Sequence, residues 1–183
     1  IQVLPQSYVV ALPSSGNAYG QIRAALDAAP ANAELVVERD FTVSSALALS
    51  KPLKWRMRDG VTATVTGSAL FYSTADLGGS VFEGGAIDLQ GSSNPVGLGI
   101  YQPNTSPVEI RRMTILNKVN AAILLLNTNG VRVRDCVLAS WSGLQSAAGI
   151  ILDHSSGCEV SGNQFVAQGT AIRSGASNSV AGD

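Results

Sequence analysis

The stretch Gly149-Ile150-Ile151-Leu152-Asp153-His154-Ser155-Ser156-Gly157-Cys158-Glu159-Val160-Ser161-Gly162-Asn163-Gln164-Phe165 decides the fold. It contains short apolar runs separated by Ser, Gly and Asn, the residues that make tight corners at low cost. Related runs occur throughout the second half of the chain, and each can be aligned on one large apolar anchor at intervals of about 20 to 28 residues. The anchors are Phe82, Ile110, Val133, Val160 and Val180.

Two further apolar columns accompany the anchors. Five positions after them stand Ile87, Ile115, Leu138 and Phe165. Ten positions before them stand Ile100, Ile123, Ile150 and Thr170. Units with three such short strands cannot close a core of their own, so they must stack on one another.

The pattern therefore predicts an all-β fold, a single-stranded right-handed parallel β-helix whose coil repeats are clear over 81–183. The corners 127–130 and 154–157 should stack from one coil to the next, because Asn, Ser and Gly recur there at matching places. The alternative is an antiparallel sandwich, which would show hairpin turns and no columns in register.

One segment near the N-terminus has helical periodicity instead. Residues 17–30 place Ile22, Ala25 and Leu26 on one face, with Asn17 as the expected N-cap and Pro30 as the stop signal. We predict a short capping α-helix that covers the first coil.

Composition excludes several classes of function. Of 183 residues only 14% are charged, and the net charge is −1, so nucleic acid is not an expected partner. Apolar runs are too short for membrane insertion. Cys136 and Cys158 form neither a disulfide framework nor a zinc site, and aspartates do not cluster at calcium-ligand spacing, so we expect no cofactor and no metal. Trp55 and Trp141 are expected to fill space or contact a subunit rather than stack on sugars.

The helix, the following Glu34-Leu35-Val36-Val37-Glu38 and the coils together resemble the pectate-lyase-like superfamily, and residues 149–165 resemble its carbohydrate-binding and sugar-hydrolase repeat. This resemblance implies a polysaccharide partner, as in phage tailspikes, pectate and alginate lyases, mannuronan epimerases and polygalacturonases. The paired aspartates with Gly-His-Gly of polygalacturonases and the Asp-Pro-His motif of epimerases are absent from the sequence. The resemblance therefore does not imply either of those chemistries.

We expect one domain over 1–183. Because residues 180–183 begin a new coil, this domain is predicted to be the N-terminal part of a longer protein or to have its end covered by another subunit.

Charged residues flank the anchors at outward positions and suggest a glycan-binding face. Neighbouring coils lie about 4.8 Å apart, so Glu109, Arg132 and Glu159 should form a charged ladder, with Arg111 and Arg134 side by side and Glu83 beyond them. The face is either a solvated, mutually neutralised surface or a shallow groove for an acidic or hydroxyl-rich glycan.

Catalytic candidates are fewer. His154, which is the sole histidine, stands beside Asp153 as a base beside a carboxylate would, although a salt bridge from Asp153 to Arg173 one coil later would explain the pair without chemistry. Asp88, Asp135 and Asp76 are the other acids that could pair at the roughly 5 to 9.5 Å needed for glycosidic cleavage.

These features predict a polysaccharide-binding β-helix of the phage tailspike or secreted depolymerase type. If it is an enzyme, it is a glycoside hydrolase or polysaccharide lyase. Its expected location is extracellular, on a virion or on a cell surface, with a homotrimer as the candidate assembly. The alternative is a noncatalytic structural or adhesion module that self-associates through the same surface.

Overall fold

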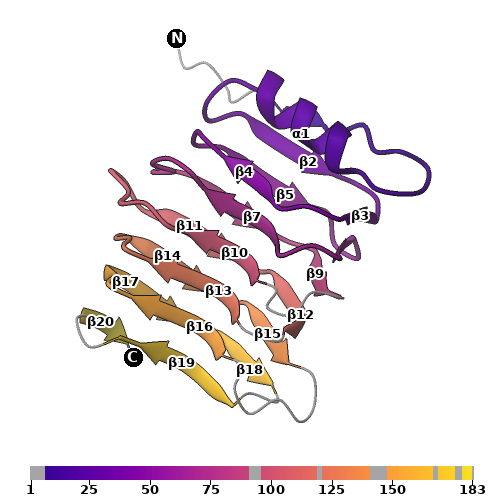
Figure 1. Cartoon of the computed structure of the whole chain (residues 1–183). Helices are drawn as coiled ribbons and strands as arrows, with labels where there is room; N and C mark the ends of the chain where they lie inside the picture. The colour runs from indigo at the N-terminus through magenta and orange to yellow at the C-terminus, as the bar shows by residue number, and fades with distance from the viewer. Residues whose placement is uncertain are drawn as a thin grey trace.

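The chain winds into a right-handed stack of coils, each of which contributes one short strand to each of three parallel sheets (Figure 1). This computed structural model describes residues 7–90, 96–118, 121–140, 148–166, 169–175 and 179–182. Every strand pairing within the described residues is parallel and joins neighbouring coils. The predicted parallel β-helix is confirmed.

One of the three sheets is longer than the other two. Sheet 1 has eight strands: β1 (Ser7–Val9), β2 (Glu34–Val37), β5 (Lys54–Met57), β8 (Val81–Glu83), β11 (Val108–Arg111), β14 (Val131–Arg134), β17 (Ser156–Ser161) and β20 (Ser179–Gly182). Sheet 2 has six: β3 (Phe41–Val43), β6 (Thr62–Val65), β9 (Ala86–Leu89), β12 (Thr114–Lys118), β15 (Val137–Ser140) and β18 (Gln164–Val166). Sheet 3 also has six: β4 (Leu47–Leu49), β7 (Ala69–Ser73), β10 (Val96–Ile100), β13 (Ala121–Leu126), β16 (Ala148–Asp153) and β19 (Thr170–Ser174).

Alternating side chains give most strands one buried face, and these faces join into a single core along the stack. Strand β10 is buried at every residue, whereas β19 is exposed at every residue. The anchor column of sheet 1 is in register from Phe82 through Ile110 and Val133 to Val160. It also extends upstream through Trp55 and Leu35, where the sequence repeat was not recognised. The second predicted column, in sheet 2, is in register throughout.

Trp55 occupies the centre of this core. It is fully buried, and its ring packs edge-on against Phe71 at 4.9 Å and against Phe41 at 6.3 Å between ring centroids. The expected space-filling role of Trp55 is confirmed, whereas Trp141 lies outside the described residues.

Three predicted alignments, those of Val180, Thr170 and Ile100, are wrong by two residues. Val180 pairs with Cys158, so that Gly182 takes the position beside Val160. The same error places Thr170 beside Ala148 rather than beside Ile150, whose partner is Ile172.

In the third predicted column, Ile100 pairs with Leu125, and Leu98 is the true neighbour of Ile123. The corner between β10 and β11 is longer than the corners that follow it, and the fixed offset used to align the sequence could not account for that.

The predicted cap is helix α1 (Tyr19–Ala28), which lies at the N-terminal end of the stack (Figure 1). Ile22 and Leu26 are buried against the first coil, as predicted. The N-cap is Ala18 rather than Asn17, but the Asn17 side chain accepts the Tyr19 amide at 3.1 Å. No helix among the described residues has the length and hydrophobicity that a membrane span requires.

The corners between sheets 1 and 2 share one backbone conformation. Gly84, Arg112, Asp135 and Gly162, one in each of four successive coils, all have positive φ between 51° and 77°. At Gly84 the coils also approach closely, because a Cβ atom there would lie 2.3 Å from the carbonyl oxygen of Met57. Only glycine meets both requirements at that position.

A column of buried polar side chains lines the corners between sheets 3 and 1. Asn104, Thr128 and Ser155 are all buried. The Asn104 amide donates to Thr128 Oγ1 at 2.9 Å, and the Thr128 backbone amide donates to Ser155 Oγ at 3.4 Å. The Asn104 side-chain oxygen in turn accepts the Leu77 amide at 3.2 Å, so the column connects four coils.

Both cysteines are free and buried. Burial raises the pKa of the Cys136 thiol from 9.0 to about 11. Because the folded pKa is the higher one, this thiol contributes full stability below pH 9, and the contribution is lost as the pH rises towards 11. We expect the free energy of unfolding to fall by up to about 2 to 3 kcal/mol over this range on account of Cys136. Denaturant titrations at several pH values should show a shallower decline in Cys136→Ala, and equal slopes would contradict the assignment.

Candidate functional site

Outward side chains of sheet 1 form two parallel columns. The first column contains Ser7, Glu34, Lys54, Val81, Glu109, Arg132 and Glu159. The second contains Val9, Val36, Arg56, Glu83, Arg111, Arg134 and Ser161. The sequence-predicted charged residues all belong to these columns, so the structure does bring them together on one face.

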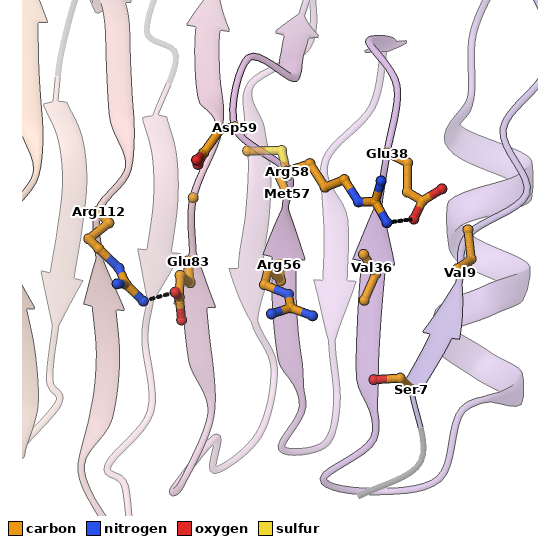
Figure 2. Close-up of a pocket in the computed structure, with 11 residues that line it drawn as sticks. Ser7, Val9, Val36, Glu38, Arg56, Met57, Arg58, Asp59, Glu83 and Arg112 are labelled. Carbon is orange, nitrogen blue, oxygen red and sulfur yellow. Dashed lines mark hydrogen bonds and ion pairs between the residues drawn. The ribbon is translucent and has the colours of Figure 1, made fainter.

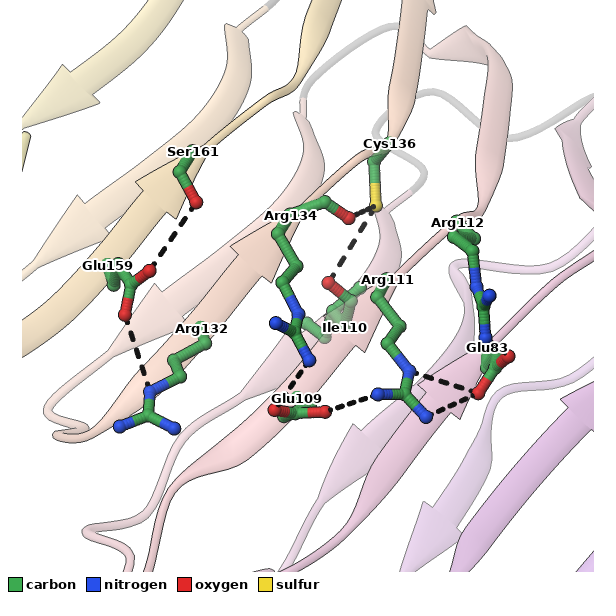
Figure 3. A network of polar contacts seen from close by, with 10 residues as sticks. All are labelled: Glu83, Glu109, Ile110, Arg111, Arg112, Arg132, Arg134, Cys136, Glu159 and Ser161. Atoms are coloured by element: carbon green, nitrogen blue, oxygen red, sulfur yellow. Dashed lines mark hydrogen bonds and ion pairs between the residues drawn. The ribbon is translucent and has the colours of Figure 1, made fainter. Parts of the chain in front are cut away.

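The ion pairs on this face run both along and between the columns (Figure 3). Glu109 bridges Arg111 and Arg134, each at 3.0 Å, and does not pair with Arg132 as predicted. Arg132 instead contacts Glu159 at 3.4 Å. We call this network of Glu83, Glu109, Arg111, Arg134 and the Arg132–Glu159 pair the charged strip.

Glu83 connects the charged strip to the rest of the sheet. Its carboxylate accepts two hydrogen bonds from Arg111, at 2.8 and 3.0 Å, and also pairs with Arg112. Partial burial alone would raise the pKa of Glu83, but the hydrogen bonds and charges of Arg111 and Arg112 outweigh it and hold the pKa below its ordinary value. Glu83 is therefore an ionised acceptor at neutral pH.

A groove of about 580 Å³ opens beside Glu83 at the N-terminal end of sheet 1 (Figure 2). It spans β1, β2, β5 and β8, and the corner residue Arg112 borders it. Its lining residues are Ser7, Val9, Val36, Glu38, Arg56, Met57, Arg58, Asp59, Glu83, Gly84 and Arg112.

Charges in the groove balance, because three guanidinium groups face three carboxylates. Arg58 pairs with Glu38 at 2.6 Å, and Arg112 pairs with Glu83. Within the described part of the chain, Asp59 is the lining carboxylate that forms no ion pair. The groove thus offers many hydrogen-bond donors and acceptors with little net charge, a surface suited to a hydroxyl-rich ligand.

Sequence reasoning missed this groove. Its residues come mostly from the coils before residue 81, where the sequence repeat was not recognised. The spacing of Arg56 and Arg58, two positions apart at the end of an expected strand, was a usable signal, because residues at this spacing lie on the same face. The position of Arg112 depends on its left-handed corner, which the sequence pattern does not reveal.

His154 and Asp153 do contact one another, at 2.7 Å between Nδ1 and Oδ1, on an exposed corner between β16 and β17. The predicted salt bridge from Asp153 to Arg173 is wrong, because Arg173 pairs with Ile151 in the sheet. The left-handed φ of His154 matches that of Asn127 one coil earlier, so the predicted stacking of these corners is confirmed.

The remaining acids are dispersed over other parts of the surface. Asp88 lies on sheet 2, where it accepts hydrogen bonds from Gln90 and Asn117, and Asp135 lies at a corner between sheets 1 and 2. Asp76 holds the turn before β8. A side-chain hydrogen bond from Thr105 and the Gly78 amide lower its pKa.

These acids therefore do not converge with Asp153 on one site. Among the residues that the structure describes, no group of three or more His, Cys, Asp and Glu side chains is placed to hold a metal ion.

Comparisons with known proteins agree with the fold. No protein-family model matches the sequence, and no curated protein matches it. The structure resembles the crystal structure of "a putative glycosyl hydrolase from Parabacteroides merdae ATCC 43184", with a TM-score of 0.74 and 14% sequence identity over 97% of this chain and 96% of that chain. At this identity the similarity shows the fold alone, and it supports the β-helix.

Proposed function

We propose that this protein binds a polysaccharide in the groove on sheet 1. The observation that carries the proposal is the balanced set of three guanidinium groups and three carboxylates around an open hollow of about 580 Å³. Vicinal hydroxyls of a sugar can accept from a guanidinium and donate to a carboxylate, so such a set recognises sugars without requiring a charged ligand. The naming of a protein of similar fold as a glycosyl hydrolase adds support.

The charged strip continues from the groove along the same sheet. Its arginines are already occupied by Glu83, Glu109 and Glu159, so they have less capacity to bind an acidic glycan than unpaired arginines would. The groove arginines are ion-paired as well, to Glu34, Glu38 and Glu83, so the choice between the two surfaces rests on the hollow, and we place the contact in the groove.

The test compares two double variants. Arg56→Ala/Arg112→Ala alters the groove, whereas Arg132→Ala/Arg134→Ala alters the strip and serves as the matched control. Exposed ion pairs contribute under about 1 kcal/mol each, so both variants should melt close to the wild type. Affinity electrophoresis in gels containing dextran, glucomannan, alginate or polygalacturonate should show about a tenfold loss of binding in the groove variant only, comparable to removing one or two charge-assisted hydrogen bonds.

The salt dependence distinguishes the classes of glycan. Binding of a neutral polymer should change little with salt, whereas binding of a polyuronate should weaken as salt rises. A loss confined to the strip variant would transfer the site to Arg132 and Arg134. Failure of the wild type to bind every polymer in the panel would reject the proposal.

A tailspike-like or depolymerase-like protein would also cleave the bound chain. Glu83, which is held ionised, suits a charge-stabilising role, and Asp59 is the groove carboxylate available for the acid or base role. We expect new reducing ends or unsaturated products from the bound polymer, and we expect Asp59→Asn to abolish them without loss of binding. Binding without any product would leave the protein a noncatalytic module. Under either outcome we propose an extracellular, virion or cell-surface location.

A further inference from the structure

A second hollow lies on the outer face of sheet 3, away from the charged residues. Its volume is about 600 Å³, and its lining residues are Ala46, Ser68, Ala69, Tyr72, Val96, Tyr101 and Leu124. None of these side chains is charged. This volume falls in the range typical of sites for small ligands, roughly 300 to 1,000 Å³.

Strand register brings the two tyrosines together. Tyr72, Gly99 and Leu124 are direct neighbours on β7, β10 and β13. The Gly99 position is filled by the ring of Tyr101, since a Cβ atom on Gly99 would lie 2.3 Å from Tyr101 Oη and 2.6 Å from its Cζ. The Tyr101 ring therefore lies back over β10, between Tyr72 and Leu124.

Tyr101 is held in this position from the neighbouring strand. Its backbone amide donates to the Oγ of buried Ser73 at 2.8 Å. Burial raises the pKa of Tyr101, so the phenol remains protonated and can still donate a hydrogen bond. Both phenol rings are half-buried, and the Tyr101 ring already covers Gly99 before any ligand arrives, which reduces the entropy lost on binding.

We propose that this hollow is a second carbohydrate site, which takes the apolar face of a neutral pyranose ring. The C–H groups on one face of such a ring complement the negative face of an aromatic ring, and its hydroxyls can reach the two phenols and Ser68. A charged sugar would find no counter-charge among the lining residues. The site shares no residue with the groove on sheet 1 and does not depend on it.

A second copy of the chain is a less suitable occupant. Apolar residues continue from the hollow along sheet 3, but Ala121, Ala148 and Ile151 are already buried. These three side chains therefore add almost no accessible apolar area to the hollow, whereas a stable interface buries about 800 Å² per partner.

The four tyrosines of the chain allow a direct test. Protein labelled with 3-fluorotyrosine should give one ¹⁹F resonance each for Tyr8, Tyr19, Tyr72 and Tyr101, assigned through single Tyr→Phe variants. We would titrate it with maltohexaose, cellohexaose, xylohexaose and mannohexaose, and with hexagalacturonate as the acidic comparison. At least one neutral hexasaccharide should shift the resonances of Tyr72 and Tyr101 but not those of Tyr8 and Tyr19. Hexagalacturonate should leave the resonances of Tyr72 and Tyr101 unchanged.

Variants refine the assignment. Tyr72→Ala should weaken the binding of that hexasaccharide about tenfold, while Tyr72→Phe should retain most of it because the ring remains. The Arg56→Ala/Arg112→Ala variant should give unchanged shifts, so failure at one site is distinguishable from failure at the other. The proposal is overturned if no neutral probe shifts Tyr72 and Tyr101, or if these resonances move with protein concentration alone, as self-association would require.

Discussion

Val133→Asp is expected to cost about 4 kcal/mol or more of folding free energy, enough to unfold most single domains at 37 °C. Val133 has no exposed surface and stands between Ile110 and Val160 in the anchor column of sheet 1. A carboxylate there would lack a partner, because the neighbouring inward positions are apolar. Urea titration followed by circular dichroism would measure the loss.

The adjacent residue provides the control. Arg132 is 47% exposed on the opposite face of the same strand, so Arg132→Ala should change the free energy of unfolding by less than about 1 kcal/mol. Comparable losses in the two variants would mean that the strand does not have the buried and exposed faces described above.

Gly84→Ala is the second substitution expected to have a large effect, about 3 kcal/mol or more. The residue has a φ of +77°, which alone disfavours alanine by roughly 1 kcal/mol. The new Cβ would also lie 2.3 Å from the Met57 carbonyl oxygen, which is backbone and cannot rotate away. The two neighbouring coils that contain β5 and β8 would have to separate, with loss of the packing between these strands.

Gly79→Ala separates the two causes. Gly79 has a similar φ of +83°, but nothing lies within 4 Å of a Cβ atom built on it. Its substitution should therefore cost only the conformational part, about 1 kcal/mol. If thermal or urea unfolding gave Gly84→Ala and Gly79→Ala the same loss, the close approach of the coils at Met57 would be refuted.

The sequence was informative where spacing between strands stays constant. From β8 onward, sheets 1 and 2 are joined by two-residue corners whose first residue is left-handed, so the offset of five positions from Ile110 to Ile115 repeats in the next coils. Sheets 3 and 1 are joined by corners of different lengths, and there the fixed offset failed for Ile100. The error at Val180 has another cause, because the residue beside Val160 is Gly182, which carries no apolar side chain that could mark it as an anchor. The apolar pattern of a sequence indicates the strands of a parallel sheet, but it does not show which residues of neighbouring strands pair.

Only part of the candidate site could be predicted from the sequence. The charges of the strip were placed on one face correctly, because inward anchors fix outward neighbours. Which carboxylate pairs with which guanidinium depends on side-chain reach, and so the partner of Glu109 was misassigned. The sequence did not indicate the role of Tyr101, because this residue comes directly after β10 and its ring folds back over Gly99.

The buried column of Asn104, Thr128 and Ser155 has a consequence for folding. Apolar columns are tolerant: a strand displaced by two residues would still put apolar side chains inside, so hydrophobic burial hardly distinguishes the native pairing from its nearest competitors. Hydrogen bonds are less tolerant. A coil displaced by two residues would leave the Asn104 amide enclosed without its acceptors on Thr128 and Asn129, at a cost of about 1 to 3 kcal/mol for each group. The column therefore selects the native register. It contributes modestly to stability, but a coil that docks in a wrong register loses these hydrogen bonds.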